Sequence, residues 1–152
     1  MMKTILTPID FSKVSDAVVK AAVNLAKAVD GRIVLLHVVQ PPVITSEYGA
    51  VMANIREIVA VSEKTSHKAL TSRLKRIEAA GVKATIAQST GSPVAGILEQ
   101  ARKTKAAYIV IGSHGRSALY DLFAGSTASG LLRRAACPVV VVPAAAAKKK
   151  GK

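Results

Sequence analysis

A glycine-bearing segment between a strand-like run and a helical run is the feature of this sequence best suited to chemistry. Gly112 and Gly115 enclose two polar residues, and nine residues then separate Gly115 from Gly125. Glycine lets backbone N–H groups approach a ligand closely, because no Cβ stands in the way. The spacing predicts a cradle for phosphate groups. The alternative is a surface loop whose glycines only allow turns.

Polar residues in and after this segment add hydrogen-bond donors and positive charge. Ser126 and Thr127 open the next helical run, whose free N–H groups and partial positive charge favour an anion. Ser113 offers a hydroxyl donor, and His114 and Arg116 would bring positive charge near the phosphates. We predict binding here, and no catalytic role for His114.

The usual nucleotide-binding motifs are missing from this sequence. No G-x-x-x-x-G-K-[ST] pattern occurs, so the chain is not a P-loop NTPase. The first strand-like run is followed by Pro8 and Asp10 where a typical dinucleotide-binding fold carries glycines.

Strand-like and helix-like runs alternate along the chain. Strands are expected at residues 3–9, 32–39, 82–88, 107–111 and 139–142, and helices at 13–29, 51–80, 93–103 and 127–135. We expect Ser12 and Ser92 to cap their helices, and Asp30-Gly31 to end the first one with positive φ. This alternation predicts an α/β fold with a single open, doubly wound parallel sheet and helices on both faces.

Ligands of such sheets bind at the carboxyl ends of the strands, where the winding reverses. Three segments fall there: Thr7 to Asp10, His37 to Val39, and the loop from Gly112. For Asp10 alone, a helix cap or a surface charge is the alternative. We expect His37, in an apolar strand, to be a hydrogen-bonded core residue, and His67 to be solvated.

Composition and charge limit the class of protein. The 152 residues suit one domain, and half of them are hydrophobic with only 3% aromatic, so Val, Ile, Leu and Ala must build the core. The net charge of +13 favours polyanions or serves solubility, without choosing between them. We expect the lysine-rich residues 144–152 to be a disordered tail.

Cysteine content and hydropathy suggest a compartment. Cys137, the one cysteine, cannot form an internal disulfide, and we expect a structural thiol because no base is evident beside it. No apolar run approaches the roughly 20 residues of a membrane span, and no signal peptide is recognisable. A cytoplasmic protein without a membrane partner is the expectation.

The sequence resembles the universal stress protein family, in its ATP-binding branch. The G-x2-G-x9-G-[S/T] pattern of that branch is matched by Gly112, Gly115, Gly125 and Ser126. Further matches are Pro8-Ile9-Asp10, His37-Val38 and the terminal CPVVVV run. The resemblance covers residues 2–143 and makes 1–143 the expected nucleotide-binding domain.

The resemblance implies a fold like that of the adenine nucleotide alpha hydrolases, with five strands in the order 3-2-1-4-5. It also implies ATP as ligand, with any Mg²⁺ or Mn²⁺ held mainly by the phosphates. The implied roles are adenosine contacts from Asp10 and the backbone near Val38, an adenine and ribose lining from Ile111 and Gly112, phosphate contacts from Gly115, Gly125, Ser126 and Thr127, and a pocket floor from Thr7 and Pro8. The pattern leaves ADP, AMP and cyclic dinucleotides open.

Family resemblance further implies a homodimer through antiparallel pairing of the last strand, Val139, Val140, Val141 and Val142. We predict a nucleotide-dependent regulator of the stress response with little or slow hydrolysis, because only Asp10 is placed to hold magnesium or orient water. One alternative is a nucleotide-dependent α/β enzyme. The other is a basic nucleic-acid-binding module, which the lack of interleaved aromatic residues disfavours.

Overall fold

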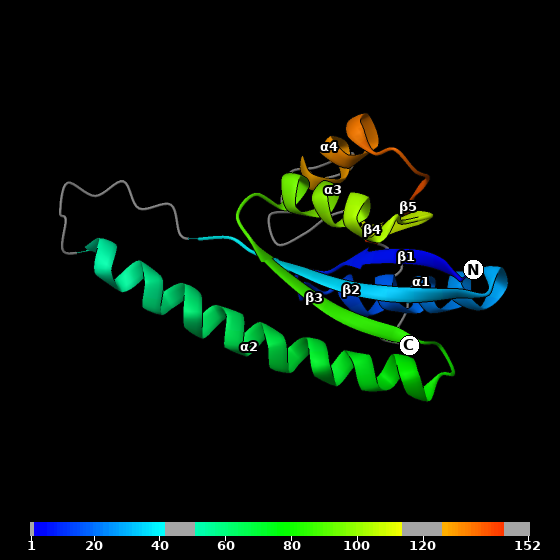
Figure 1. The fold of residues 1–152 in the computed structure, drawn as a ribbon, viewed down its shortest axis with the longest axis horizontal. Coiled ribbons are helices and arrows are strands. Elements are labelled where there is room, and N and C mark those ends of the chain that lie inside the picture. The colour runs from blue at the N-terminus through cyan, green and yellow to red at the C-terminus, as the bar shows by residue number, and fades with distance from the viewer. Residues whose placement is uncertain (1, 42–50, 114–125, 145–152) are drawn as a thin grey trace.

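Five parallel strands form one open sheet in the computed structural model, which describes residues 2–41, 51–113 and 126–144. The sheet order is β3-β2-β1-β4-β5 (Figure 1), and every neighbouring pair is parallel. The strands are β1 (Lys3–Pro8), β2 (Gly31–Val39), β3 (Ala84–Thr90), β4 (Tyr108–Gly112) and β5 (Val139–Val142). The predicted fold class and strand order are confirmed.

Helices cover both faces of the sheet. They are α1 (Ser15–Val29), α2 (Val51–Ala79), α3 (Pro93–Thr104) and α4 (Ser126–Arg134). One core packs α1 and α2 against residues such as Ile5, and the other packs α3 and α4 against residues such as Leu6. Because consecutive side chains of a strand point to opposite faces, both cores require apolar residues, which explains the nearly continuous apolar run of β2.

Helix α2 is the longest element, and its amino-terminal part extends past the sheet (Figure 1). Ile58 and Val61 are exposed on this part, 47% and 64% respectively. Among the described residues, no helix combines the length and the apolar character that crossing a membrane requires.

The start of α1 differs from the prediction. Its N-cap residue is Val14, which makes no side-chain cap hydrogen bond, so Ser12 does not cap this helix. The Ser12 N–H instead donates to Asp10 Oδ1, 2.9 Å away, because the chain makes a separate turn before the helix begins. Ser92 does occupy the N-cap position of α3, with Pro93 following it, but its side chain accepts no cap hydrogen bond from the helix.

The turn from α1 into β2 uses two residues for two different reasons. Asp30, not Gly31, adopts the left-handed conformation that ends the helix, with φ of 53°. Gly31 is already in β2, where a Cβ would lie 2.9 Å from the Lys3 carbonyl oxygen. The glycine is therefore required by close backbone approach and not by positive φ.

Candidate functional site

The carboxyl ends of β1, β2 and β4 bring predicted site residues to one edge of the sheet. Thr7 and Pro8 end β1 and pair with Leu35 and Leu36 of β2, and Val38 follows two residues later in that strand. On the other side of β1, β4 ends at Gly112. The chain winds from β1 to β2 in one direction and to β4 in the other, so this edge is the switch point where open α/β sheets bind ligands.

The turn after β1 fixes the Asp10 carboxylate. Its Oδ1 accepts hydrogen bonds from the Ser12 N–H at 2.9 Å and from the Ser15 hydroxyl at 3.5 Å. The Ile9 N–H, immediately before it, donates to the Leu36 carbonyl at 2.8 Å. Asp10 is therefore half-buried and held by its own loop at the switch edge, and it is not the N-cap of α1.

His37 occupies the last part of β2 and serves the same loop. Its Nδ1 lies 2.8 Å from the Ile9 carbonyl oxygen, which can only accept, so Nδ1 carries the hydrogen. Its ring packs against the Phe11 ring, with the centroids 4.6 Å apart. The predicted hydrogen bond of His37 is confirmed, although the residue is half-buried and not part of the core. His67 is exposed on α2 as expected.

The end of β4 is fastened to β5. Ile111 is buried in the core beneath α3 and α4, and Gly112 is half-buried. The Ser113 N–H donates to the Val142 carbonyl at 2.8 Å, and the Ser113 Oγ accepts from the Ala144 N–H at 3.0 Å. Ser113, which directly follows β4, is thus hydrogen-bonded to the end of β5 and to Ala144 beyond it. The sequence did not indicate this role.

Only the two ends of that loop are described. His114, Gly115, Arg116 and Gly125 lie outside the described residues, as does the tail from residue 145 onward. Ser126 and Thr127 lie in the first turn of α4, and Ala128 and Leu131 of the same helix are buried in the core. The predicted strand before the glycine pattern and the predicted helix after it are both present.

Three hydroxyls near the same edge went unrecognised as a group in the sequence. Thr7 Oγ1, Ser12 Oγ and Ser89 Oγ are buried and have no hydrogen-bond partner among the described residues. A buried hydroxyl without a partner is costly, so it calls for an explanation. Their common feature is position: Thr7 ends β1, Ser12 follows it, and Ser89 lies near the end of β3.

Cys137 lies away from this edge, before β5. Its side chain packs against the core formed with α3 and α4, and burial raises the pKa of its thiol above the ordinary value. A raised pKa keeps the thiol protonated and unreactive near neutral pH. Within the described part of the chain, no group of three His, Cys, Asp or Glu side chains could hold a metal ion.

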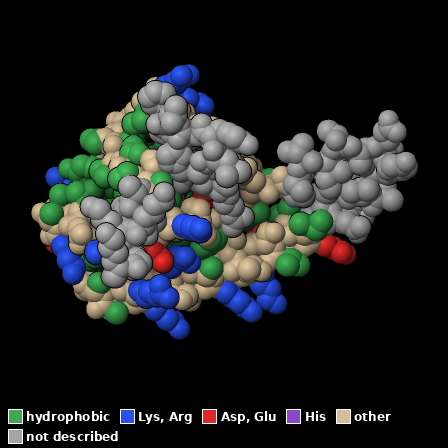
Figure 2. Space-filling model, turned by 180° about the vertical axis from the view of Figure 1, so that it is seen from behind, with side chains coloured by type: hydrophobic (Ala, Val, Ile, Leu, Met, Phe, Trp, Pro, Cys, Tyr) green, Lys and Arg blue, Asp and Glu red, His purple; other side chains and the backbone are tan. Residues whose placement is uncertain are grey.

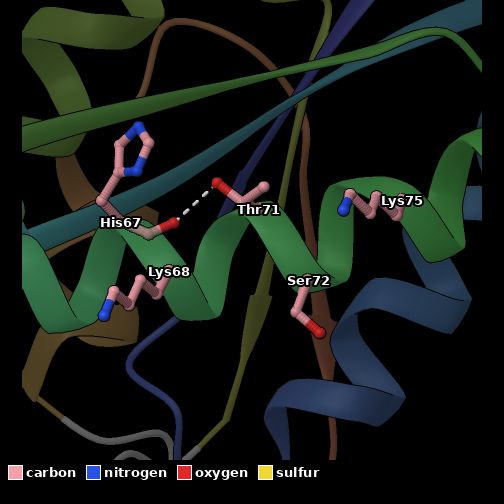
Figure 3. A pocket seen from close by; sticks show the side chains of 5 residues that line it. All are labelled: His67, Lys68, Thr71, Ser72 and Lys75. Atoms are coloured by element: carbon pink, nitrogen blue, oxygen red, sulfur yellow. Dashed lines mark hydrogen bonds between the residues drawn. The ribbon is translucent and has the colours of Figure 1, made fainter.

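Two shallow depressions lie along α2, separate from the predicted site. The first, of about 430 Å³, is lined by His67, Lys68, Thr71, Ser72 and Lys75 (Figure 3). All five residues come from one helix, and the Thr71 hydroxyl donates to the carbonyl of His67. The second shares His67 and Lys68 and reaches Gln88 of β3. Neither includes any predicted nucleotide-binding residue.

The strand order places the molecule among the open, doubly wound α/β proteins. The model of the universal stress protein family matches residues 1–143, and this chain belongs to that family.

Two curated relatives are similar over nearly the whole chain. Universal stress protein MJ0531 of Methanocaldococcus jannaschii is 32% identical over 143 residues, covering 93% of this chain and 82% of that protein. Universal stress protein YxiE of Bacillus subtilis is 31% identical over 147 residues, covering 93% and 99%.

Solved structures share the fold. Universal stress protein UspA from Lactobacillus plantarum superposes with a TM-score of 0.83 at 24% identity, covering 92% of this chain and 97% of that one. A universal stress protein in complex with cAMP has a TM-score of 0.63 at 23% identity, covering 92% and 95%. The universal stress protein from Archaeoglobus fulgidus in complex with dAMP has a TM-score of 0.63 at 19% identity, covering 93% and 98%.

Proposed function

We propose that this protein binds an adenine nucleotide, ATP in particular, at the carboxyl edge of its sheet and acts as a nucleotide-dependent regulator of the stress response. The main support for this proposal is the position of the glycine pattern between a strand and a helix. Gly112 is the last residue of β4 at the switch point, and Ser126 is the first residue of α4. A phosphate between them would meet loop N–H groups and the positive end of a helix.

The adenosine part would lie against the neighbouring strand ends. Asp10 and the backbone near Val38 would contact it, with Ile111 and Gly112 as a second wall and Thr7 and Pro8 as the floor. The buried Thr7 hydroxyl, which has no hydrogen-bond partner among the described residues, supports a polar ligand at this edge. Two proteins of the same fold have bound cAMP and dAMP, which supports the choice of an adenine nucleotide. The choice of ATP among these nucleotides rests on the resemblance to the ATP-binding branch, whose glycine pattern this sequence matches.

Regulation fits these residues better than rapid turnover. Phosphoryl transfer requires groups that hold a metal ion and orient the attacking water. Asp10 is the one predicted site carboxylate, and its Oδ1 already accepts the Ser12 N–H. Mg²⁺ or Mn²⁺ would be held mainly by the nucleotide phosphates. We therefore propose little or slow hydrolysis.

A cytoplasmic homodimer belongs to the same proposal. β5 is an edge strand, and Val140 is 37% exposed on it. An unpaired apolar edge invites pairing with another chain, and a second copy would cover it. The cytoplasmic location rests on the lone cysteine, which suits a reducing compartment.

Binding of ATP, ADP and AMP to the purified protein, measured by calorimetry with and without Mg²⁺, tests the proposal. We expect ATP to bind, and Gly115→Val to weaken it at least about tenfold by placing a side chain in the cradle. Thr71→Ala, on the surface of α2, is the matched control and should change nothing. Absence of binding at millimolar nucleotide would refute the proposal. Fast multiple-turnover phosphate release would favour the enzyme alternative.

A further inference from the structure

A stack of side chains joins α2 to the turn that carries Asp10. The Phe11 ring contacts both the His37 ring of β2, at 4.6 Å between centroids, and the Arg73 guanidinium of α2, whose Cζ is 5.0 Å from the ring centroid. Arg73 also forms an ion pair with Asp16 of α1, at 3.6 Å. Residues of β2 and α2 thus meet at one aromatic ring, and Arg73 links that ring to α1.

Phe11 adopts an unusual backbone conformation. Its φ is 61°, in the left-handed region that bulky side chains rarely enter. The other described non-glycine residues with positive φ, Asp30 and Lys105, are helix C-caps, where this conformation is common. Phe11 has no such reason. Its conformation instead belongs to the turn in which the Ser12 N–H returns to Asp10 Oδ1.

The contacts of Phe11 supply what holds this strained turn. His37 is one of these contacts, and it also hydrogen-bonds the Ile9 carbonyl just before the turn. Arg73 is the second, and its side chain is only 20% exposed. Its Nε is buried without a hydrogen-bond partner among the described residues, so the ring and the Asp16 carboxylate are the contacts that this guanidinium retains.

We propose that Phe11 and Arg73 are positioning residues for the adenine nucleotide. The Arg73–Phe11–His37 stack holds the strained turn, the turn presents Asp10, and α2 is thereby coupled to the nucleotide site. The inference rests on the proposed function. Because coupling free energies are reciprocal, nucleotide binding must restrain α2, and displacing α2 must weaken nucleotide binding.

Arg73→Met tests the coupling, since it keeps the aliphatic length and removes the guanidinium. We expect ATP binding to weaken about 3- to 10-fold, the size of a partly buried cation–π contact. Arg76→Met is the matched control, because it removes an exposed cation from the same helix and should change affinity less than about twofold. Phe11→Tyr keeps the ring and should bind like the wild type, whereas Phe11→Gly should weaken binding although it relieves the strained φ.

Hydrogen exchange of the Ser12 amide, referenced to the core amide of Ile5, gives a second readout that needs no nucleotide. We expect faster Ser12 exchange in Arg73→Met and unchanged exchange in Arg76→Met. A lower melting temperature with wild-type affinity and wild-type Ser12 exchange would overturn the proposal. If the wild type binds no adenine nucleotide, the proposed function fails, while altered Ser12 exchange would still support coupling of α2 to the turn.

Discussion

Asp10 combines two tasks in one side chain, and two substitutions separate them. Asp10→Ala removes the acceptor of the Ser12 N–H, so we expect a loss of about 1 kcal/mol in the free energy of unfolding and at least about tenfold weaker ATP binding. Asp10→Asn keeps an acceptor oxygen and should preserve stability within about 0.5 kcal/mol, with a smaller loss of affinity.

Urea unfolding and calorimetry of the two Asp10 variants measure these effects. Glu99→Gln, which removes an exposed carboxylate from α3, serves as the charge control and should leave both quantities unchanged. Wild-type ATP affinity in Asp10→Ala would remove Asp10 from the site.

Cys137 should be a slow nucleophile. Burial raises the pKa of its thiol, so a smaller fraction is thiolate at pH 7 to 8 than in an exposed cysteine. Alkylation by iodoacetamide should therefore be slower in the folded protein than in urea, and its pH midpoint should be higher. A midpoint below that of the unfolded chain would indicate an activated thiol instead.

Side-chain roles were predictable where they follow from local sequence, and not where they depend on distant partners. The position of Asp10 after β1 follows from the order of runs along the chain. The role of Phe11 does not, because Arg73 meets it only after α2 has packed on the sheet. Likewise, Ser12 has the residue type of a helix cap, but the carboxylate of Asp10 engages its backbone N–H first.

At the element scale, the apolar runs of the sequence predicted which residues are buried better than they predicted which residues pair in the sheet. The third strand is expected at 82–88 but runs from Ala84 to Thr90. Val82 is buried, yet its N–H donates to Ile77 and so helps to close α2. The polar Ser89 and Thr90 remain in the ladder, paired with Val38 and Val39. The pattern of apolar and polar residues therefore placed the predicted strand two residues too early in the chain, although the strand is present between α2 and α3 as expected.

The contact of α3 with the strand ends at the site is predicted to depend on Gly96. A Cβ there would lie 2.8 Å from Ser89 Oγ and 3.1 Å from Val38 Cγ2. Gly96→Val should push the amino end of α3 away from β2 and β3, costing about 1–3 kcal/mol of unfolding free energy. ATP binding should weaken as well, because Val38 is a predicted contact.

Ala95→Val is the control for this substitution. Ala95 is exposed on the same turn of α3, so a valine there costs only helix propensity, below about 1 kcal/mol. Urea unfolding compares the two variants. Because valine has a higher helix propensity than glycine, propensity alone would not destabilise Gly96→Val. Destabilisation no larger than that of Ala95→Val would contradict the proposed role of the close approach to β2 and β3.

At the scale of the whole molecule, positive charge gathers where the helices end. The last turn of each of the four described helices is basic, and the residues are Lys27, Arg76, Arg102, Lys103, Arg133 and Arg134. In a parallel α/β sheet these ends lie at the amino edge, opposite the predicted nucleotide site, and cations there also complement the helix dipoles. One face of the molecule shows Lys and Arg along its lower margin and few acidic side chains (Figure 2).

This charge predicts weak, sequence-independent binding of polyanions. Fluorescence anisotropy with labelled single-stranded and duplex DNA should give affinities that fall at least about tenfold between 50 and 200 mM salt. ATP should not compete, because it would bind at the opposite edge. Salt-insensitive, sequence-selective binding would instead favour a nucleic-acid-binding module.

Assembly of two copies is predicted to depend on the β5 edge. The two outer strands of the sheet differ: β3 carries polar residues such as Gln88 and Thr90, whereas β5 is valine throughout. Exposed apolar edges are the ones that other chains pair with, so β5 is the expected interface. Val140→Lys places a charge on that edge and should convert a dimer into the 15.8 kDa monomer, measured by sedimentation velocity.

Val61→Lys distinguishes this edge from the exposed part of α2. Val61 is 64% exposed, more than the 37% of Val140, so exposure alone would make α2 the better interface. An edge strand offers unpaired backbone N–H and C=O groups in addition to apolar surface, whereas the backbone of a helix is already bonded internally. Val61→Lys should therefore leave the dimer intact. A dimer that survives Val140→Lys and dissociates in Val61→Lys would place the interface on α2, and occupancy of that interface would then reach the nucleotide site through Arg73.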